Sequence, residues 1–248
     1  MIITSNFLRM NWRVIDKMKF FTDKTVINDY LLIKIKDYWK LEDKIKSEFR
    51  RWKEVFIDPG VWELTKSNEY SWREKINIKD FLNSLPDNHY FSLDYPCDMN
   101  LQYTNLFLEK SWLNALKYNT YLQYIVTVQS KFHDYLSFVE WFDRYNRLHI
   151  FSGIMGLGNL CRIHFKDQYI KHVLPYAFKN CTHPRIHIYG LALRIIPFAI
   201  KLANHYGIVL SVDNTKWTFM IYEQQEKDRN ICFNLYLDKI RKKGVIFD

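Results

Sequence analysis

Several polar residues directly follow short apolar runs of the chain, and their side chains could act together in catalysis. They are Asp58, Asp94, Gln129 and Asp213. Two carboxylates that face one pocket can divide the work, one acting as an ionised nucleophile and the other transferring a proton. The remaining Asp and Gln offer the acceptors and donors that suit the edge of a purine-like base. Aromatic residues near the same positions could stack on such a base; they are Trp62, Tyr95 and Tyr189.

Asp58 and Asp213, the two acids that could act as nucleophile and proton carrier, each also have a simpler interpretation. Asp58 precedes Pro59-Gly60, a sequence that is typical of a turn. Asp213 precedes Asn214-Thr215, where it could cap a helix. The spacing of the residues does not decide between these interpretations and a shared site.

The elements that must position these residues follow from the hydrophobic pattern. Apolar or β-branched runs predict strands at residues 30–35, 55–57, 90–93, 124–128, 149–154, 185–189 and 208–212. Amphipathic segments predict helices at residues 41–53, 106–118, 135–145, 168–178 and 192–206. Strands separated by helices indicate βα units and a parallel sheet.

The number of βα units favours a closed architecture. With one further strand expected near the N-terminus, the pattern predicts an α/β fold of the (β/α)8 TIM-barrel type, irregular at that first strand, as a single domain over residues 1–248. The C-terminal ends of all strands share one rim in such a barrel, and active sites form there. This architecture would bring the polar strand-end residues together.

Composition limits the class of protein. The 248 residues are 48% hydrophobic and 17% aromatic, which is typical of a globular chain. No stretch approaches the roughly 18–20 apolar residues of a membrane span, and charges interrupt the first thirty residues, so we expect no membrane association, no secretory signal and a cytoplasmic location, in the host if the protein is viral. The cysteines Cys97, Cys161, Cys181 and Cys232 form no CxxC pair, which argues against a disulfide scaffold or a compact zinc site.

The charge of the chain indicates a polyanionic partner. Net charge is +9 at pH 7, and nucleic acid is the usual partner of a basic chain. A bias toward Lys in an AT-rich genome, or a need for solubility, would give the same charge.

Two other patterns carry less information. Gly156-Leu157-Gly158 after a strand is similar to a phosphate-binding turn, but Cys161 stands where the third glycine of a dinucleotide-binding motif would be. Histidines are frequent in residues 149–187, yet none has metal-ligand spacing, so we expect them in the core or on the surface.

The ordered strand-end motifs resemble those of the tRNA-guanine transglycosylase superfamily, most closely its DNA-modifying branch, the 7-deazaguanine DNA transglycosylases. The resemblance covers roughly residues 56–217. Its motifs are Asp58-Pro59-Gly60-Val61-Trp62-Glu63-Leu64, Leu93-Asp94-Tyr95-Pro96-Cys97, Val128-Gln129, Met155-Gly156-Leu157-Gly158 with Cys161-Arg162, Arg185-Ile186-His187-Ile188-Tyr189-Gly190, and Ser211-Val212-Asp213 with Trp217. The resemblance implies a pentosyltransferase of viruses or bacteria. Such an enzyme replaces guanine in DNA by a 7-deazaguanine, such as 7-cyano-7-deazaguanine, without a cofactor.

The resemblance also implies catalytic roles. Asp213 matches the nucleophile that attacks C1′ and forms a covalent glycosyl–enzyme intermediate while guanine leaves. Asp58 matches the general acid/base that assists the departing base and deprotonates the incoming one. A carboxylate suits this reaction because the glycosidic carbon gains positive charge as the base departs.

Further residues match the base-binding positions of the family. Asp94 and Gln129 would read the edge of the base, and Gly156 and Leu157 would contact its carbonyl oxygen through the backbone. Tyr189-Gly190 would form the floor of the base pocket.

The chain departs from the family at two places. The usual Asp-Ser-Gly-Gly-Phe turn is replaced by Asp58-Pro59-Gly60-Val61-Trp62, which gives Trp62 the stacking position. The tRNA enzymes carry closely spaced zinc-binding cysteines after the last strands, where this chain has only Cys232, so no structural zinc is expected. The missing zinc site, the short chain and the Ser-Val-Asp and Gly-Leu-Gly-x-x-Cys-Arg patterns favour DNA over tRNA as the nucleic acid. Exchange on tRNA and a catalytically silent nucleic-acid-binding barrel are the alternatives. Members of the family are often dimers, although the sequence itself carries no interface signature.

Overall fold

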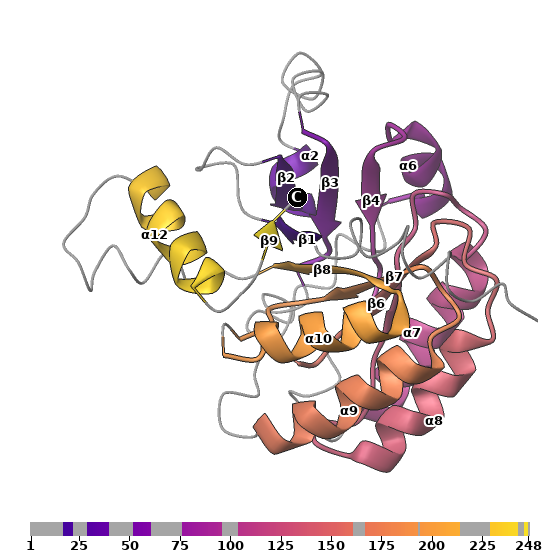
Figure 1. Ribbon diagram of the computed structural model, residues 1–248. Coiled ribbons are helices and arrows are strands. Elements are labelled where there is room, and N and C mark those ends of the chain that lie inside the picture. The colour runs from indigo at the N-terminus through magenta and orange to yellow at the C-terminus, as the bar shows by residue number, and fades with distance from the viewer. Residues whose placement is uncertain are drawn as a thin grey trace, which may run out of the picture.

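The computed structural model describes residues 17–21, 29–39, 52–60, 76–95, 104–160, 167–192, 194–213, 229–242 and 246–247. These residues form an α/β structure in which helices cover parallel strands (Figure 1). The strands are β1 (Lys17–Phe21), β2 (Tyr30–Lys34), β3 (Glu54–Asp58), β4 (His89–Phe91), β5 (Val126–Val128), β6 (Ile154–Leu157), β7 (Arg185–Ile188), β8 (Val209–Asp213) and β9 (Ile246–Phe247). The helices are α2 (Ile35–Trp39), α6 (Ile78–Ser84), α7 (Thr104–Tyr118), α8 (Tyr135–Asn146), α9 (Asp167–Asn180), α10 (Ile196–Tyr206) and α12 (Arg229–Arg241).

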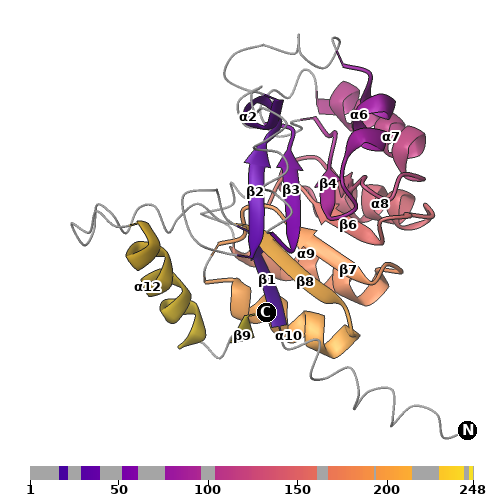
Figure 2. The ribbon, with the colours of Figure 1, turned by 90° about the horizontal axis from the view of Figure 1, so that it is seen from above.

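The strands pair in parallel and largely in chain order. One sheet has the order β5-β6-β7-β8-β1-β9 and the other has the order β2-β3-β4. A parallel bridge between Phe91 and Tyr124 links the end of β4 to the segment before β5. In the six-stranded sheet, β8 pairs with β1 (Figure 2). Asp213 is in register with Phe21 in this pair. Consecutive strands from β2 to β8 are therefore neighbours, and β8 returns to the first strand of the chain.

In β2, β3 and β6, side chains alternate between two apolar regions, as expected for a period of two. One set, which includes Val55 of β3 and Ile186 of β7, packs in the main core together with residues of the outer helices. The other set forms a smaller cluster of Tyr30, Phe56 and Ile125 with Ile154. Because β2, β3 and β6 bury apolar side chains on both faces, their runs are largely apolar rather than alternating.

The helices on the outer side bury one face each. In α8, Phe138, Trp141, Phe142 and Tyr145 are buried at the i, i+3, i+4, i+7 spacing of an amphipathic helix. Asp134 begins this helix, because its carboxylate accepts a hydrogen bond from the backbone N–H of Ser137 at 2.9 Å.

Contacts on the inner side join the two sheets directly. Arg185 of β7 donates to Glu54 of β3 at 2.5 Å. The rings of Phe56 in β3 and His187 in β7 lie 4.7 Å apart. The inner faces of β3 and β7 are therefore in contact although the strands belong to different sheets.

The predicted parallel α/β arrangement and the additional N-terminal strand, β1, are confirmed. Residues 41–51 of the helix predicted at 41–53 lie outside the described residues, and Trp52 and Lys53 form a bend. Strand β9, which pairs with β1, was not predicted. Within the described part of the chain, no helix has the length and apolar character to cross a bilayer.

The strand predicted at residues 149–154 was wrong in its position. The structure places β6 at Ile154–Leu157, so that Gly156 and Leu157 belong to the strand rather than to the loop after it. The chain turns just before Ile154, where Gly153 has a φ of +66° and Ser152 donates to the carbonyl of Tyr124 at 2.7 Å. An apolar run that includes such a turn cannot continue as an extended strand.

Candidate active site

The predicted polar residues lie at the C-terminal ends of the parallel strands. Asp58 is the last residue of β3 and Asp213 is the last residue of β8. Gln129 follows β5 directly, whereas Asp94 lies beyond the end of β4. Because the strands are parallel, these positions share one edge of the structure. Trp62, the predicted stacking residue, lies outside the described residues.

Three carboxylates lie near one another at this edge, and the charges of Asp213 and Asp94 affect the pKa of Asp58. Burial raises the pKa of the Asp58 carboxyl to about 7, and the negative charges of Asp213 and Asp94 raise it as well. The backbone N–H of Gly60, which donates to Asp58 at 2.8 Å, lowers this pKa, as does the positive charge of Lys34. A carboxyl group with this pKa can both give and take a proton near neutral pH.

Asp94 and Gln129 form one buried polar unit. The amide nitrogen of Gln129 donates a short hydrogen bond to Oδ2 of Asp94, and the hydroxyl of Ser92 lies 3.5 Å from Oδ1. Among the described residues, the carboxamide oxygen of Gln129 is buried without a hydrogen-bond partner. Buried acceptors are normally satisfied, so this oxygen is available to a ligand donor.

Gly156 in β6 and Gly158, directly after β6, leave space for neighbouring side chains. A Cβ on Gly156 would lie 2.7 Å from the hydroxyl of Thr127 and 2.9 Å from the ring of Tyr189. A Cβ on Gly158 would overlap the carboxamide of Gln129. These glycines are therefore needed for the close approach of two predicted site residues to the backbone.

Tyr189 and Gly190 make contacts beyond those predicted. Burial raises the pKa of the Tyr189 hydroxyl, and the charges of Asp94 and Asp58 raise it further. The backbone N–H of Gly190 donates to Oδ1 of Asp213 at 3.1 Å. The backbone carbonyl of Leu157 accepts from the N–H of Tyr189 at 3.3 Å. In the structure, Gly190 therefore contacts the predicted nucleophile.

Sequence reasoning missed a set of buried polar residues beneath the acids. Nε2 of His187 lies 3.3 Å from Oδ1 of Asp213, and Nδ1 of the same ring lies 3.0 Å from the hydroxyl of Ser211. Arg185 donates through Nε to that hydroxyl at 3.0 Å. Arg185 and His187 precede Tyr189 by four and two residues, and Ser211 precedes Asp213 by two residues. Polar residues at alternate positions of an apolar strand were the signal that could have revealed them.

Comparison with models of protein families, with curated proteins and with solved structures found no match to this chain. The function must therefore be argued from the residues and their geometry.

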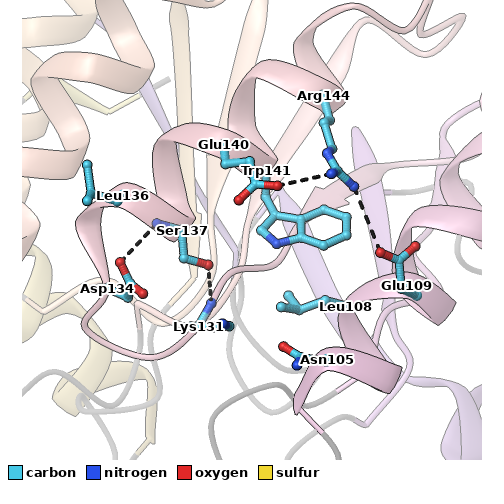
Figure 3. Close-up of a pocket in the computed structure, with 10 residues that line it drawn as sticks. All are labelled: Asn105, Leu108, Glu109, Lys131, Asp134, Leu136, Ser137, Glu140, Trp141 and Arg144. Carbon is cyan, nitrogen blue, oxygen red and sulfur yellow. Dashed lines mark hydrogen bonds and ion pairs between the residues drawn. The ribbon is translucent and has the colours of Figure 1, made fainter.

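A hollow of about 320 Å³ lies elsewhere, between α7 and α8 (Figure 3). Its lining residues are Asn105, Leu108, Glu109, Lys131, Asp134, Leu136, Ser137, Glu140, Trp141 and Arg144. Arg144 is paired with Glu140 at 3.0 Å and with Glu109 at 3.8 Å, and it stacks over Trp141 at 4.5 Å. None of the described site residues is among the residues that line this hollow, which is therefore distinct from the acid cluster.

Among the described residues, no three or more His, Cys, Asp or Glu side chains are arranged so that they could hold a metal ion.

Proposed function

We propose that this protein is a base-exchanging transglycosylase that replaces guanine in a nucleic acid by a 7-deazaguanine, with DNA as the preferred substrate. The observation that carries the proposal is that Asp58, Asp94 and Asp213 come to one region from the ends of separate strands: burial raises the pKa of Asp58, and the charges of Asp213 and Asp94 raise it further. These are the three acids to which the family resemblance gives the central roles.

The proposed reaction has two balanced half-reactions. Asp213 attacks C1′ of the target nucleotide, the C1′–N9 bond breaks, and the departing guanine takes a proton from Asp58. In the second half-reaction, ionised Asp58 removes the N9 proton of the incoming 7-deazaguanine. The N9 electron pair then attacks C1′ and releases Asp213. Asp58 returns to its protonated form, so no further proton donor is required.

Asp94 and Gln129 are suited to bind the exchanged base. The carboxylate of Asp94 accepts hydrogen bonds, and the unpaired carboxamide oxygen of Gln129 is a second acceptor. Guanine and 7-deazaguanines carry N–H donors at N1 and at the exocyclic amine, so two adjacent acceptors match that edge. Rigid placement of both groups by the buried hydrogen bond between them favours selection of one base edge.

We also propose that the strands close into a (β/α)8 barrel. The pairing of β8 with β1, the bridge from Phe91 to Tyr124, and the inner contact of Arg185 with Glu54 support this arrangement. Closure would require the edges of β1 and β2 to meet. In a barrel, the acids would line a single mouth into which an unstacked nucleotide could enter.

The direct experiment is incorporation of a labelled base. The full chain is incubated with radiolabelled guanine or 7-cyano-7-deazaguanine and with duplex DNA, single-stranded DNA or tRNA. The proposal predicts label in DNA, and Asp213→Ala serves as the control that should incorporate none. Label in tRNA alone would overturn the choice of DNA. Label in neither polymer would overturn the exchange reaction and favour a barrel that only binds nucleic acid.

A further inference from the structure

His187 lies directly beneath Asp213 in the interior. Its ring is fully buried, between the rings of Phe56 at 4.7 Å and Tyr189 at 4.4 Å. One ring nitrogen, Nε2, faces Oδ1 of Asp213 at 3.3 Å, and the other, Nδ1, faces the hydroxyl of Ser211 at 3.0 Å. These two T-shaped ring contacts and the complete burial of the side chain leave the imidazole little freedom to turn.

The surroundings of His187 select one tautomer. Burial lowers the pKa of this imidazole, so the ring is neutral at neutral pH and only one of its nitrogens carries hydrogen. A lone pair on Nε2 would face a carboxylate oxygen of Asp213 and be repelled. The hydrogen therefore lies on Nε2, where it faces Asp213 in a close electrostatic contact, while Nδ1 accepts from the hydroxyl of Ser211.

Arg185 orients the hydroxyl of Ser211 so that it can donate its hydrogen to His187. Arg185 donates through Nε to Ser211 Oγ at 3.0 Å, and its Nη1 donates to Glu54 at 2.5 Å. With its oxygen accepting from Arg185, Ser211 directs its own hydrogen to His187. The carbonyl of Ile186 lies at 3.4 Å and is the more distant acceptor for that hydrogen. The donor groups thus all point in one direction: Arg185 toward Ser211, Ser211 toward His187, and His187 toward Asp213.

This chain of donors ends on one oxygen of Asp213. Oδ1 receives the backbone N–H of Gly190 at 3.1 Å and faces Nε2 of His187. The hydrogen bond from Gly190 and the contact with Nε2 both act on Oδ1 and orient the carboxylate.

We propose that His187, oriented by Ser211 and Arg185, is a positioning residue that fixes Asp213 through Oδ1 and presents Oδ2 to the sugar. The second half of this statement rests on the proposed function, whereas the positioning itself can be measured without any activity.

The charged and titratable groups around this pair come from several elements. Arg185 and Glu54 face His187 from β7 and β3, with opposite effects on its pKa. Asp58 faces Asp213 from β3, and Tyr236 of α12 lies close enough for Asp213 to raise its pKa.

Hydrogen exchange of the Gly190 amide tests the positioning directly, because that amide is held by Asp213. We compare His187→Phe, which removes the donor, with His187→Gln, whose Nε2 lies the same number of bonds from Cβ as that of histidine. The amide of Gly158, which donates to Val128 at 3.0 Å, is the reference. His89→Phe is the control, because His89 is equally buried but lies outside the chain of donors.

The expected pattern is specific. His187→Phe should speed exchange at Gly190 by about 10-fold relative to Gly158, whereas His187→Gln and His89→Phe should change this ratio by less than about 3-fold. Nitrogen-15 NMR should show the hydrogen of His187 on Nε2. The proposal is overturned if the ratio is unchanged in His187→Phe, if Gln fails to restore it, or if the hydrogen lies on Nδ1.

Base exchange adds a second measurement. His187→Phe should lower kcat by roughly 10- to 100-fold with little change in the KM for the free base, and His187→Gln should recover most of it. An equal loss in His187→Gln and His187→Phe would overturn the positioning role. If the wild-type protein exchanges no base while the amide pattern appears as expected, the proposed function fails and the positioning of Asp213 stands.

Discussion

The carboxylate of Asp213 lies close enough to Asp58 for its charge to raise the pKa of Asp58, although the two residues end different strands, β8 and β3, of different sheets. The negative charge of Asp213 adds to burial in favouring the protonated form of Asp58. One ionised and one protonated acid is the pair that nucleophilic displacement at a glycosidic carbon requires.

Replacement of Asp213 should remove the nucleophile and leave the fold intact. We expect Asp213→Ala to lower base exchange by at least about 1,000-fold, because the covalent route is then closed. Polynucleotide affinity, measured by fluorescence anisotropy over a salt series, should stay within a few-fold of wild type. An Asp213→Ala protein that exchanges base at the wild-type rate would contradict the assignment.

Replacement of Asp58 should change the pH dependence of guanine release. The carboxyl must be protonated to assist the departing base, so single-turnover release should fall as pH rises through about 7 in the wild-type protein. Asp58→Asn keeps an acceptor for the Gly60 amide but has no proton to give. We expect release about 100- to 10,000-fold slower and without that descending limb. A limb near pH 7 that persists in the variant would identify another proton donor.

The same substitution should change stability in a pH-dependent way. The pKa of Asp58 is raised from 3.8 to about 7 on folding, so the folded state binds this proton more tightly and stability is lost as pH rises between these values. The Asp58→Asn variant has no carboxyl group at this position, so it does not lose stability in this way. Urea unfolding should show the two proteins close at pH 4 and the variant more stable above pH 7, by roughly 1–3 kcal/mol. A stability difference independent of pH would show that Asp58 titrates normally.

Gly158 should matter for base recognition because its missing side chain leaves space for Gln129. A Cβ there would displace the Gln129 carboxamide from Asp94. We expect Gly158→Ala to raise the KM for the free base by about 10-fold, with a smaller change in kcat. Gly207→Ala is the control: its Cβ would meet nothing within 4 Å, although its φ of +71° costs stability. Equal effects of the two variants on KM would contradict a specific role for the Gly158 position.

The convergence of the acids could be predicted because each follows an apolar run, and the ends of parallel strands share one edge. Asp58 and Asp213 were found in this way without knowledge of the distance between them. His187 and Ser211 were missed, because attention to strand ends overlooks polar residues within a strand. The start of β6 was misplaced for a different reason: the left-handed turn at Gly153 depends on tertiary contacts of Ser152, which the hydrophobic pattern does not contain.

The most direct measurement is identification of the residue that carries the sugar during exchange. The full chain is mixed with guanine-containing DNA without free base, denatured rapidly and digested, and the adducted peptide is sequenced by mass spectrometry. We predict a deoxyribose ester on Asp213, absent from Asp213→Ala and retained, at a lower rate of formation, in Asp58→Asn. An adduct on Asp58 or Asp94, or base exchange that proceeds with no adduct at any aspartate, would contradict the account.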